Sequence, residues 1–349
     1  MTRRRRWMVA GILLSVLLVV GGTFAVSAAR YATAPVRVTV NAQPITSFDN
    51  RDPSKVRFGA LEFRGGLAMT SKFEPFGGIS GIHMEPDGSR FTGVTDRGSW
   101  IRGRIVYRDG KPEDVVDVEM APILGADGKP LAERGWYDSE SLTELDGKFY
   151  VGLERVDQIV RFDFRRDGVL ARGEPIKVPD DFKTFARNKG LECLAAAPKG
   201  SVHAGKLIAV TENSPDAAGN LRAYVIGDAA SSTAGASVIR FSVKQSDEFE
   251  VSDCTVLLPG DLLLLERRYS PARGVAMRIR RVPVAAIKEG ALVDGKIMIE
   301  ADLAYQIDNM EGIGLHRTAQ GETVLTLVSD DNFSAIQRNL LLQFTLAGE

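Results

Sequence analysis

The side chains best suited to chemistry in this sequence are acidic, and they recur at matched positions. Five segments begin with a small or acidic residue in a short apolar run, and each is followed by a second apolar run that ends in an acid. The leading residues are Ser80, Glu140, Glu192, Asp253 and Glu311. The acids that end the second runs are Asp96, Glu154, Glu212, Glu266 and Asp330. If folding gathers these carboxylates, they could bind a cation or exchange protons with a substrate.

The types of ligand available indicate a hard metal ion. Only three histidines are present, at positions 83, 203 and 316, and they are too far apart in the sequence for a histidine-rich zinc centre. Sets of oxygen ligands suit Ca²⁺ or Mg²⁺. We therefore expect Ca²⁺ as a cofactor, with the acids that end the second runs as ligands and the leading acids Glu140, Glu192, Asp253 and Glu311 as the catalytic groups.

Three arginines directly follow acids of the second runs, namely Arg97, Arg155 and Arg267. A guanidinium group is a good partner for phosphate or carboxylate, so these residues are candidates for binding an anionic substrate. The alternative is that each repeated acid only accepts hydrogen bonds from N–H groups in its own repeat.

A serine nucleophile finds little support in the sequence. Residues 78–82 read Gly-Ile-Ser-Gly-Ile, which lacks the second glycine of a G-x-S-x-G elbow and its strand-to-helix context. Ser80 and His83 are three residues apart and would lie on opposite sides of a strand. Hydrolysis here would therefore use water activated by a carboxylate or a metal.

The elements that must position these residues are short β-type runs separated by turn signals such as Asp-Gly at 109–110 and 146–147. After residue 30 no long helical stripe is present, apart from a possible short turn at 284–287. The leading residues are 60, 52, 61 and 58 positions apart, which is the size of a propeller blade with generous loops.

The pattern predicts an all-β fold, a β-propeller of five four-stranded blades, with six blades as the alternative. The last repeat supplies about three strands, so we expect a strand at 56–63 to complete it and close the ring. Because the innermost strands of a propeller line its central channel, the repeated acids are expected at one mouth of that channel.

The N-terminus has the basic, apolar and small-residue regions of an export signal. We expect residues 1–28 to be a signal peptide, 29–55 a linker and 56–349 a single domain. Export would be to the periplasm or beyond. The alternative is an uncleaved inner-membrane anchor, which would be the protein's only membrane contact.

The charge balance bears on partners. The chain has 44 basic and 45 acidic residues, and removal of the four arginines at 3–6 would change its net charge from −1 to −5. No basic block remains that would favour nucleic acid. We expect a monomer that binds a small anionic or ester substrate.

Cys193 and Cys254 each follow a leading acid, so they occupy equivalent positions in this alignment of the repeats. Equivalent side chains of neighbouring blades point the same way around the ring. We therefore expect the two cysteines to lie too far apart for a disulfide.

At these same positions the chain resembles the bacterial phytase-like family of exported proteins, described by the words esterase-like activity of phytase. The matching segments are residues 77–81, 95–98, 138–141, 189–192, 266–267, 309–312 and 329–332. The resemblance implies an exported β-propeller and a hydrolase that acts on phosphoric or carboxylic esters. A non-catalytic binding or envelope-scaffold propeller and a lactonase-like propeller remain as alternatives.

Overall fold

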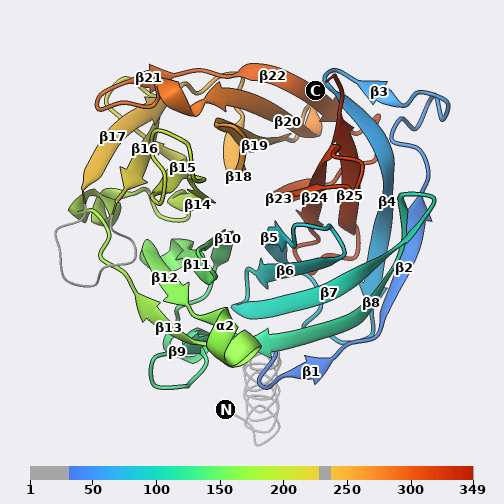
Figure 1. The fold of residues 1–349 in the computed structure, drawn as a ribbon, viewed down its shortest axis with the longest axis horizontal. Coiled ribbons are helices and arrows are strands. Elements are labelled where there is room, and N and C mark those ends of the chain that lie inside the picture. Colours follow the sequence, from blue (N-terminus) through green and yellow to red (C-terminus); the bar gives the residue numbers. More distant parts are fainter. Residues whose placement is uncertain (1–30, 228–236, 349) are drawn as a thin grey trace, which may run out of the picture.

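Five small sheets, mainly antiparallel, stand in a ring around a central axis (Figure 1). The structure, a computed structural model, describes residues 31–227 and 237–348. The chain is a five-bladed β-propeller, which confirms the predicted all-β fold. The described residues form five sheets, so the six-bladed alternative is wrong.

The first three blades each run outward from a short strand at the axis. Blade 1 consists of β5 (Ile79–Met84), β6 (Arg90–Thr95), β7 (Ser99–Arg108) and β8 (Lys111–Pro122), with β1 (Val36–Arg37) at its edge. Blade 2 consists of β10 (Ser139–Leu145), β11 (Lys148–Leu153), β12 (Gln158–Phe162) and β13 (Arg172–Pro175), with β9 (Leu124–Gly125) at its edge. Blade 3 consists of β14 (Leu191–Ala196), β15 (Leu207–Pro215), β16 (Leu221–Ile226) and β17 (Val238–Val243), with β21 (Leu292–Val293) at its edge.

The last two blades complete the ring. Blade 4 consists of β18 (Glu250–Leu257), β19 (Asp261–Ser270), β20 (Gly274–Pro283) and β22 (Lys296–Asp302). Blade 5 consists of β23 (Asn309–Arg317), β24 (Thr323–Asp330), β25 (Asn339–Leu346), β4 (Leu61–Ser71) and β2 (Val40–Ile45), and β3 (Arg57–Phe58) pairs with β4. An N-terminal strand therefore lies beside the C-terminal one and closes the ring, as predicted.

The closing strand differs in its bounds from the strand expected at 56–63. β4 begins at Leu61 and runs for 11 residues, and β3 folds back on its start. The segment expected as a linker also contributes β1 and β2 to the sheets. Its apolar side chains cause this, since Ala32 and Val38 are buried in the core of blade 1.

Apolar side chains fill the spaces between blades. Between blades 1 and 2, for example, the ring of Trp100 lies edge-on to those of Phe162 and Phe164, with centroids 5.1 and 4.6 Å apart. The predicted Asp-Gly turns are present, and Asp146 and Gly147 both have the positive φ that a tight hairpin requires.

In residues 31–227 and 237–348, helical structure is limited to single turns. These are α2 (Phe164–Asp167) and 3₁₀ turns at Leu131–Arg134, Glu154–Val156, Gly168–Leu170, Asp180–Thr184 and Val284–Ala286. The last of them is the turn expected near 284–287. Within the described ranges, no helix has the length and apolar character needed to cross a membrane. The predicted signal peptide lies outside the described residues.

The two ends of the described chain lie on opposite faces of the ring. The N–H of Ala32 donates to Ser99 Oγ at 3.1 Å, and Ser99 begins β7 one tight turn after Asp96. β25 starts at Asn339 beside this face and ends at Leu346 on the other, where it pairs with Leu61. The chain therefore enters the fold on the face that carries the ends of the acid-bearing strands.

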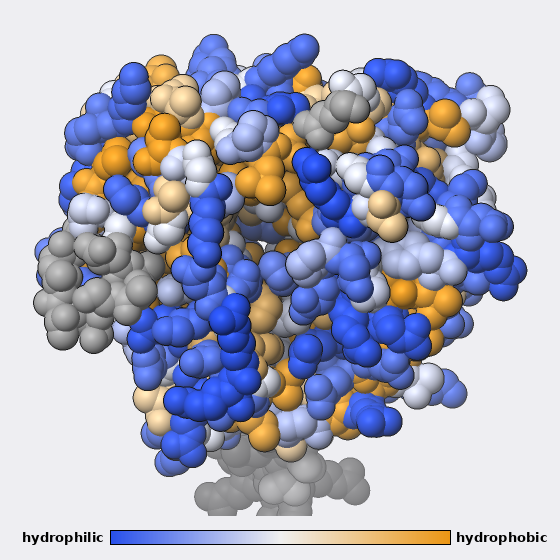
Figure 2. Space-filling view, in the orientation of Figure 1, coloured by the Kyte–Doolittle hydropathy of each residue, from blue (hydrophilic) through white to orange (hydrophobic). Residues whose placement is uncertain are grey.

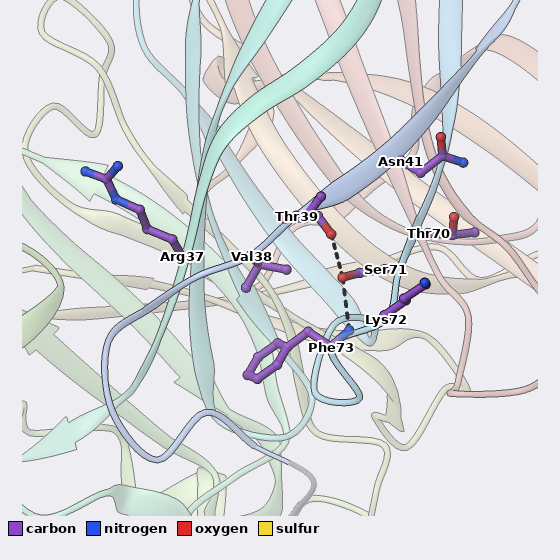
Figure 3. Close-up of a pocket in the computed structure, with 8 residues that line it drawn as sticks. All are labelled: Arg37, Val38, Thr39, Asn41, Thr70, Ser71, Lys72 and Phe73. Atoms are coloured by element: carbon purple, nitrogen blue, oxygen red, sulfur yellow. Dashed lines mark hydrogen bonds between the residues drawn. The ribbon is translucent and has the colours of Figure 1, made fainter.

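A surface hollow of about 800 Å³ is formed by the N-terminal segment and the end of β4 (Figure 3). There, Ser71 Oγ donates to the carbonyl of Thr39 and accepts from the N–H of Phe73, which fixes the segment to β4. None of the repeated acids lines this hollow.

Candidate active site

Each innermost strand carries a β-bulge near its start, and the bulged residues Glu140, Glu192 and Glu311 line a cavity at the centre of the ring. The extra residues in the pairings are Ser80, Glu140, Glu192, Ser252 and Glu311. A bulge bends the strand and aims one side chain out of the regular alternation. Four of these residues are the predicted leading residues of the repeats.

In blade 4 the structural alignment differs by one residue from the alignment made on sequence. The bulge falls at Ser252, so Asp253 occupies the position of Gly81, Ser141, Cys193 and Gly312 in the other blades. The second strand is shifted in the same way. The residue just before each bulge is paired with a residue of the second strand, and the residues that follow these partners are Asp96, Glu154, Glu212, Arg267 and Asp330. Arg267 therefore takes the place of the acid in blade 4.

Seven of the ten repeated residues meet in a cavity of about 240 Å³. Its charged lining consists of the carboxylates Asp96, Asp138, Glu140, Glu154, Glu192, Glu212, Glu311 and Asp330 and the cations Lys189 and Arg267, with Asn188, Asn309 and Asn332 among its polar groups. A narrow opening is visible at the centre of the molecule, where the inner strands meet (Figure 2). Eight carboxylates against two cations leave a strong excess of negative charge.

Burial makes this excess costly and raises the pKa of most of these acids. Burial, and then the charge of Asp330, raise the pKa of Asp96 to about 8. Burial also raises the pKa of Glu311 to about 8, although Arg267 opposes the shift. The pKa values of Glu154 and Asp330 are raised less, to about 7 and about 6, again by burial first. For Glu140 and Glu192, burial and neighbouring carboxylates raise the pKa well above the usual range.

Arg267 is the counter-ion at the centre of this cluster. Its Nη2 lies 2.9 Å from Glu212 Oε1, its Nε lies 3.1 Å from Glu311 Oε2, and its Nη1 donates to Asn309 Oδ1 at 3.1 Å. The charges of Glu311 and Glu212 raise the pKa of Arg267 despite its burial. Arg267, in blade 4, therefore balances the charge of one acid in blade 3 and one in blade 5.

A second cation, Lys189, approaches from the loop before β14. Its Nζ lies 3.0 Å from Glu212 Oε2 and 2.9 Å from Glu250 Oε2. Both oxygens of Glu212 therefore contact a basic side chain, whereas Glu192 Oε2 is buried and has no hydrogen-bond partner among the residues that the structure describes.

One carboxylate oxygen from each of Glu154, Glu192 and Glu212 lies within 4.8 Å of the others. Oxygen ligands at 2.3–2.6 Å from Ca²⁺ can be up to about 5 Å apart across the ion. Glu192 Oε2, which accepts no hydrogen bond from the described residues, is available as a ligand for a cation. This buried acidic cluster could therefore hold a metal ion.

A family model described as phytase-like, with esterase-like activity of phytase, matches residues 74–333. The chain belongs to the phytase-like family. No curated protein matches its sequence. Among solved structures, a glutaminyl cyclase from Myxococcus xanthus is 10% identical, with 89% of this chain and 98% of that chain covered and a TM-score of 0.41. Sqt1 from Saccharomyces cerevisiae is 9% identical, with 83% and 82% covered and a TM-score of 0.39.

Two predicted site residues of this phytase-like chain lie away from the cavity. Asp253 is fully buried between blades 4 and 5, where its Oδ2 accepts the N–H of Ile313 at 2.8 Å. Glu266 is also fully buried, and its oxygens lie 2.6 Å from Arg278 Nε and Arg280 Nη2. The one-residue shift in blade 4 explains both positions, because adjacent strand residues face opposite sides.

Two of the predicted anion-binding arginines lie beside the cavity and are stacked on aromatic rings. The guanidinium of Arg97 lies 3.1 Å from the ring centre of Phe333, and that of Arg155 lies 4.5 Å from the ring centre of Tyr137. Neither lines the cavity, whereas Arg267 does. The charge of Arg155 still acts on Asp138, whose pKa is raised by burial and lowered by this arginine.

The expectation of unpaired cysteines is wrong, because Cys193 and Cys254 form a disulfide with a Cα–Cα distance of 5.1 Å. After the shift in blade 4, Cys254 corresponds to Leu194 and not to Cys193. The two cysteines therefore lie on opposite faces of their strands, and each faces the other blade. The bond joins β14 to β18 directly below the acidic cavity.

Five residues that line the cavity were not predicted, namely Asp138, Asn188, Lys189, Asn309 and Asn332. Asp138 and Asn309 stand two residues before a leading acid, so a wider comparison of the repeats would have found them. Lys189 and Asn188 come from a loop, and Asn332 from another, where no strand pattern fixes the direction of a side chain.

Proposed function

We propose that this phytase-like protein is an exported hydrolase that cleaves a phosphate ester or a related ester in the acidic cavity, with assistance from Ca²⁺. The observation that carries the proposal is the excess of buried carboxylates over cations around the unpartnered oxygen of Glu192. A volume of about 240 Å³ suits one ester head group, with the remainder of the substrate at the open mouth.

Glu154, Glu192 and Glu212 are the residues that would hold the ion. When bound, Ca²⁺ would offset the acidic charge and withdraw electron density from the anionic oxygens of the ester. Arg267 and Lys189 keep Glu212 in place from its other side, at 2.9 and 3.0 Å.

The proton transfers fall to two acids whose pKa values differ. With a pKa of about 6, Asp330 is mainly ionised at neutral pH and can accept a proton from the attacking water. With a pKa of about 8, Glu311 is mainly protonated and can donate its proton to the leaving oxygen. The new bond joins the water oxygen to phosphorus or carbon, and the bond to the leaving oxygen breaks. Asp330 gains one proton and Glu311 loses one.

The arginines Arg97 and Arg155 would attract an anionic substrate toward the mouth. Their stacking on Phe333 and Tyr137 holds the guanidinium planes in a defined orientation, which lowers the entropy lost on binding.

Export is supported by the disulfide, since such bonds persist mainly in oxidising compartments such as the periplasm. Together with the predicted signal at 1–28, the disulfide favours a periplasmic or secreted protein.

Hydrolysis of an alkyl phosphate and of 4-nitrophenyl phosphate and acetate, with Ca²⁺ or with a chelator, tests the proposal. We expect Ca²⁺-dependent turnover that is lost in Glu192→Gln. An alkoxide leaving group needs a proton, whereas 4-nitrophenolate can leave without one. Glu311→Gln should therefore slow hydrolysis of the alkyl phosphate by about 10²-fold or more and hydrolysis of the nitrophenyl esters much less.

Glu300→Gln is the matched control, because Glu300 is exposed on β22 of blade 4. Binding of Ca²⁺ without turnover of any of these esters would refute the hydrolase and favour the binding propeller. Equal turnover in Glu192→Gln and Glu300→Gln would remove the acidic cavity from the chemistry.

A further inference from the structure

A polar row crosses the face of blade 1 that packs against blade 2. His83 of β5 is paired with Thr92 of β6, and Thr92 is paired with Arg102 of β7. Residues directly opposite one another in neighbouring strands lie on the same face of a sheet, so these three side chains lie side by side. The ring centres of His83 and Phe149 are 5.3 Å apart, which shows that this face looks toward blade 2.

Polar groups in this position need an explanation, because apolar side chains fill most of the interface between blades 1 and 2. Among the residues that the structure describes, no hydrogen bond or ion pair of the His83, Thr92 or Arg102 side chain is found, and Thr92 is only 2% exposed. The polar groups of these three side chains line the cleft beside them and are available to a ligand.

The row opens into a cleft of about 380 Å³ between the two blades. Its other wall is aromatic, with Phe149 of β11 and Phe164 of α2, whose ring centres are 4.7 Å apart. His83 lies three residues beyond Ser80 along β5, about 10 Å further from the end of the strand at which the acidic cavity lies, and the two cavities share no lining residue. The cleft is therefore a separate site on the side of the ring away from the acidic mouth.

The charges in the cleft limit what it can bind. Two arginines, Arg102 and Arg165, and two glutamates, Glu85 and Glu144, line the cleft. The formal charges of these four side chains sum to zero. Glu144 Oε1 accepts the N–H of Gly147, and the Arg165 side chain lies over that glycine. A dianion would be repelled by the two glutamates, whereas one carboxylate can face Arg102, the Thr92 hydroxyl and an N–H of His83.

We propose that this cleft between blades 1 and 2 binds a small monocarboxylate that carries an aromatic ring. The guanidinium of Arg102 holds the carboxylate, and the ring of the ligand lies against Phe149 and Phe164. Burial lowers the pKa of His83, so at neutral pH its imidazole is uncharged and offers one donor and one acceptor to the ligand.

Calorimetric titration with 3-phenylpropionate tests the proposal, with 3-phenylpropan-1-ol and acetate as probes that lack the charge or the ring. We expect 3-phenylpropionate to bind with a Kd of roughly 1 mM or lower and the two partial probes to bind at least about 10-fold more weakly. Arg102→Gln should weaken binding by roughly 10- to 100-fold, and Arg102→Lys less, because lysine keeps the charge but loses the planar fork.

Arg104→Gln is the matched control, since Arg104 lies on the same strand, pairs with Asp117 at 3.0 Å and does not line the cleft. Phe164→Ala tests the aromatic wall independently, and thermal melts verify that each variant is folded. Equal affinity of wild type and Arg102→Gln would overturn the proposal. So would equal binding of the alcohol, or a crystal soak that places 3-phenylpropionate only in the acidic cavity.

Discussion

Arg267 gives the sharpest test of how the acidic cavity is balanced. In Arg267→Gln the carboxylates of Glu212 and Glu311 lose a cation at 2.9 and 3.1 Å. Breaking a buried ion pair from one side costs about 3–5 kcal/mol. Because the Arg267 side chain is 26% exposed, solvent screens part of this, and we expect a loss of about 2–4 kcal/mol when the acids are ionised.

The loss should depend on pH in a defined direction. Carboxylates whose pKa is raised by folding, such as Glu311 at about 8, destabilise the folded protein as pH rises through that value. Arg267 reduces this destabilisation, so its removal matters little near pH 5, where the acids are mainly protonated. At pH 9 the loss corresponds to a Tm lower by about 3–6 °C for a domain of about 300 residues.

Thermal melts of wild type and variant from pH 5 to 9, without added metal, measure this difference. Arg268→Gln is the control, because Arg268 is the next residue but stacks on Phe249 at 4.6 Å instead of entering the cavity. The same decrease in Tm at pH 5 and pH 9, or an equal pH dependence in Arg268→Gln, would refute the assignment of Arg267 as the counter-ion.

Three further predictions concern the metal, the shift in blade 4 and the disulfide. Ca²⁺ at about 100 times its Kd should stabilise the protein by about 2.7 kcal/mol, or about 4 °C in Tm. This increase in Tm should be smaller at pH 5 than at pH 8, because Glu154, with a pKa of about 7, must lose its proton to bind the ion. Equal increases in Tm at the two pH values would contradict a carboxylate site. In calorimetric titrations Glu192→Gln should weaken Ca²⁺ binding, whereas Asp253→Asn and Glu266→Gln should leave it unchanged. Loss of Ca²⁺ binding in Asp253→Asn or Glu266→Gln would argue against the one-residue shift of blade 4. Reduction of Cys193–Cys254, which are 61 residues apart, should cost about 4 kcal/mol in the chain-entropy model, and Cys254→Ser should melt at the same temperature with and without reductant.

Much of the fold could be predicted because the same signal occurs five times. Short apolar runs, Asp-Gly turns and acids about 58 residues apart together predict a ring of five blades, and a C-terminal repeat one strand short predicts closure by an N-terminal strand. The places of residues 36–45 in the sheets were harder to predict, although this segment alternates apolar and polar residues as a strand does. Their burial depends on contacts with β4 and β8, which sequence periodicity does not report.

The site was predicted where the repeats are regular and missed where one repeat is shifted. In blade 4 the sequence Val-Ser-Asp-Cys offers an acid at the wrong position, and alignment on that acid placed Asp253 and Glu266 in the cavity. The bulge at Ser252 decides the register, and a bulge depends on backbone geometry that an acidic side chain does not signal. The same shift hid the role of Arg267 and the pairing of Cys193 with Cys254.

The position of Ala32 against Ser99 has a practical consequence for handling the protein. Any tag or surface tether joined ahead of residue 31 starts on the face that carries the acidic mouth. A tether after Leu346 leaves from the opposite face. Immobilisation through the C-terminus should therefore leave the mouth accessible to ligands.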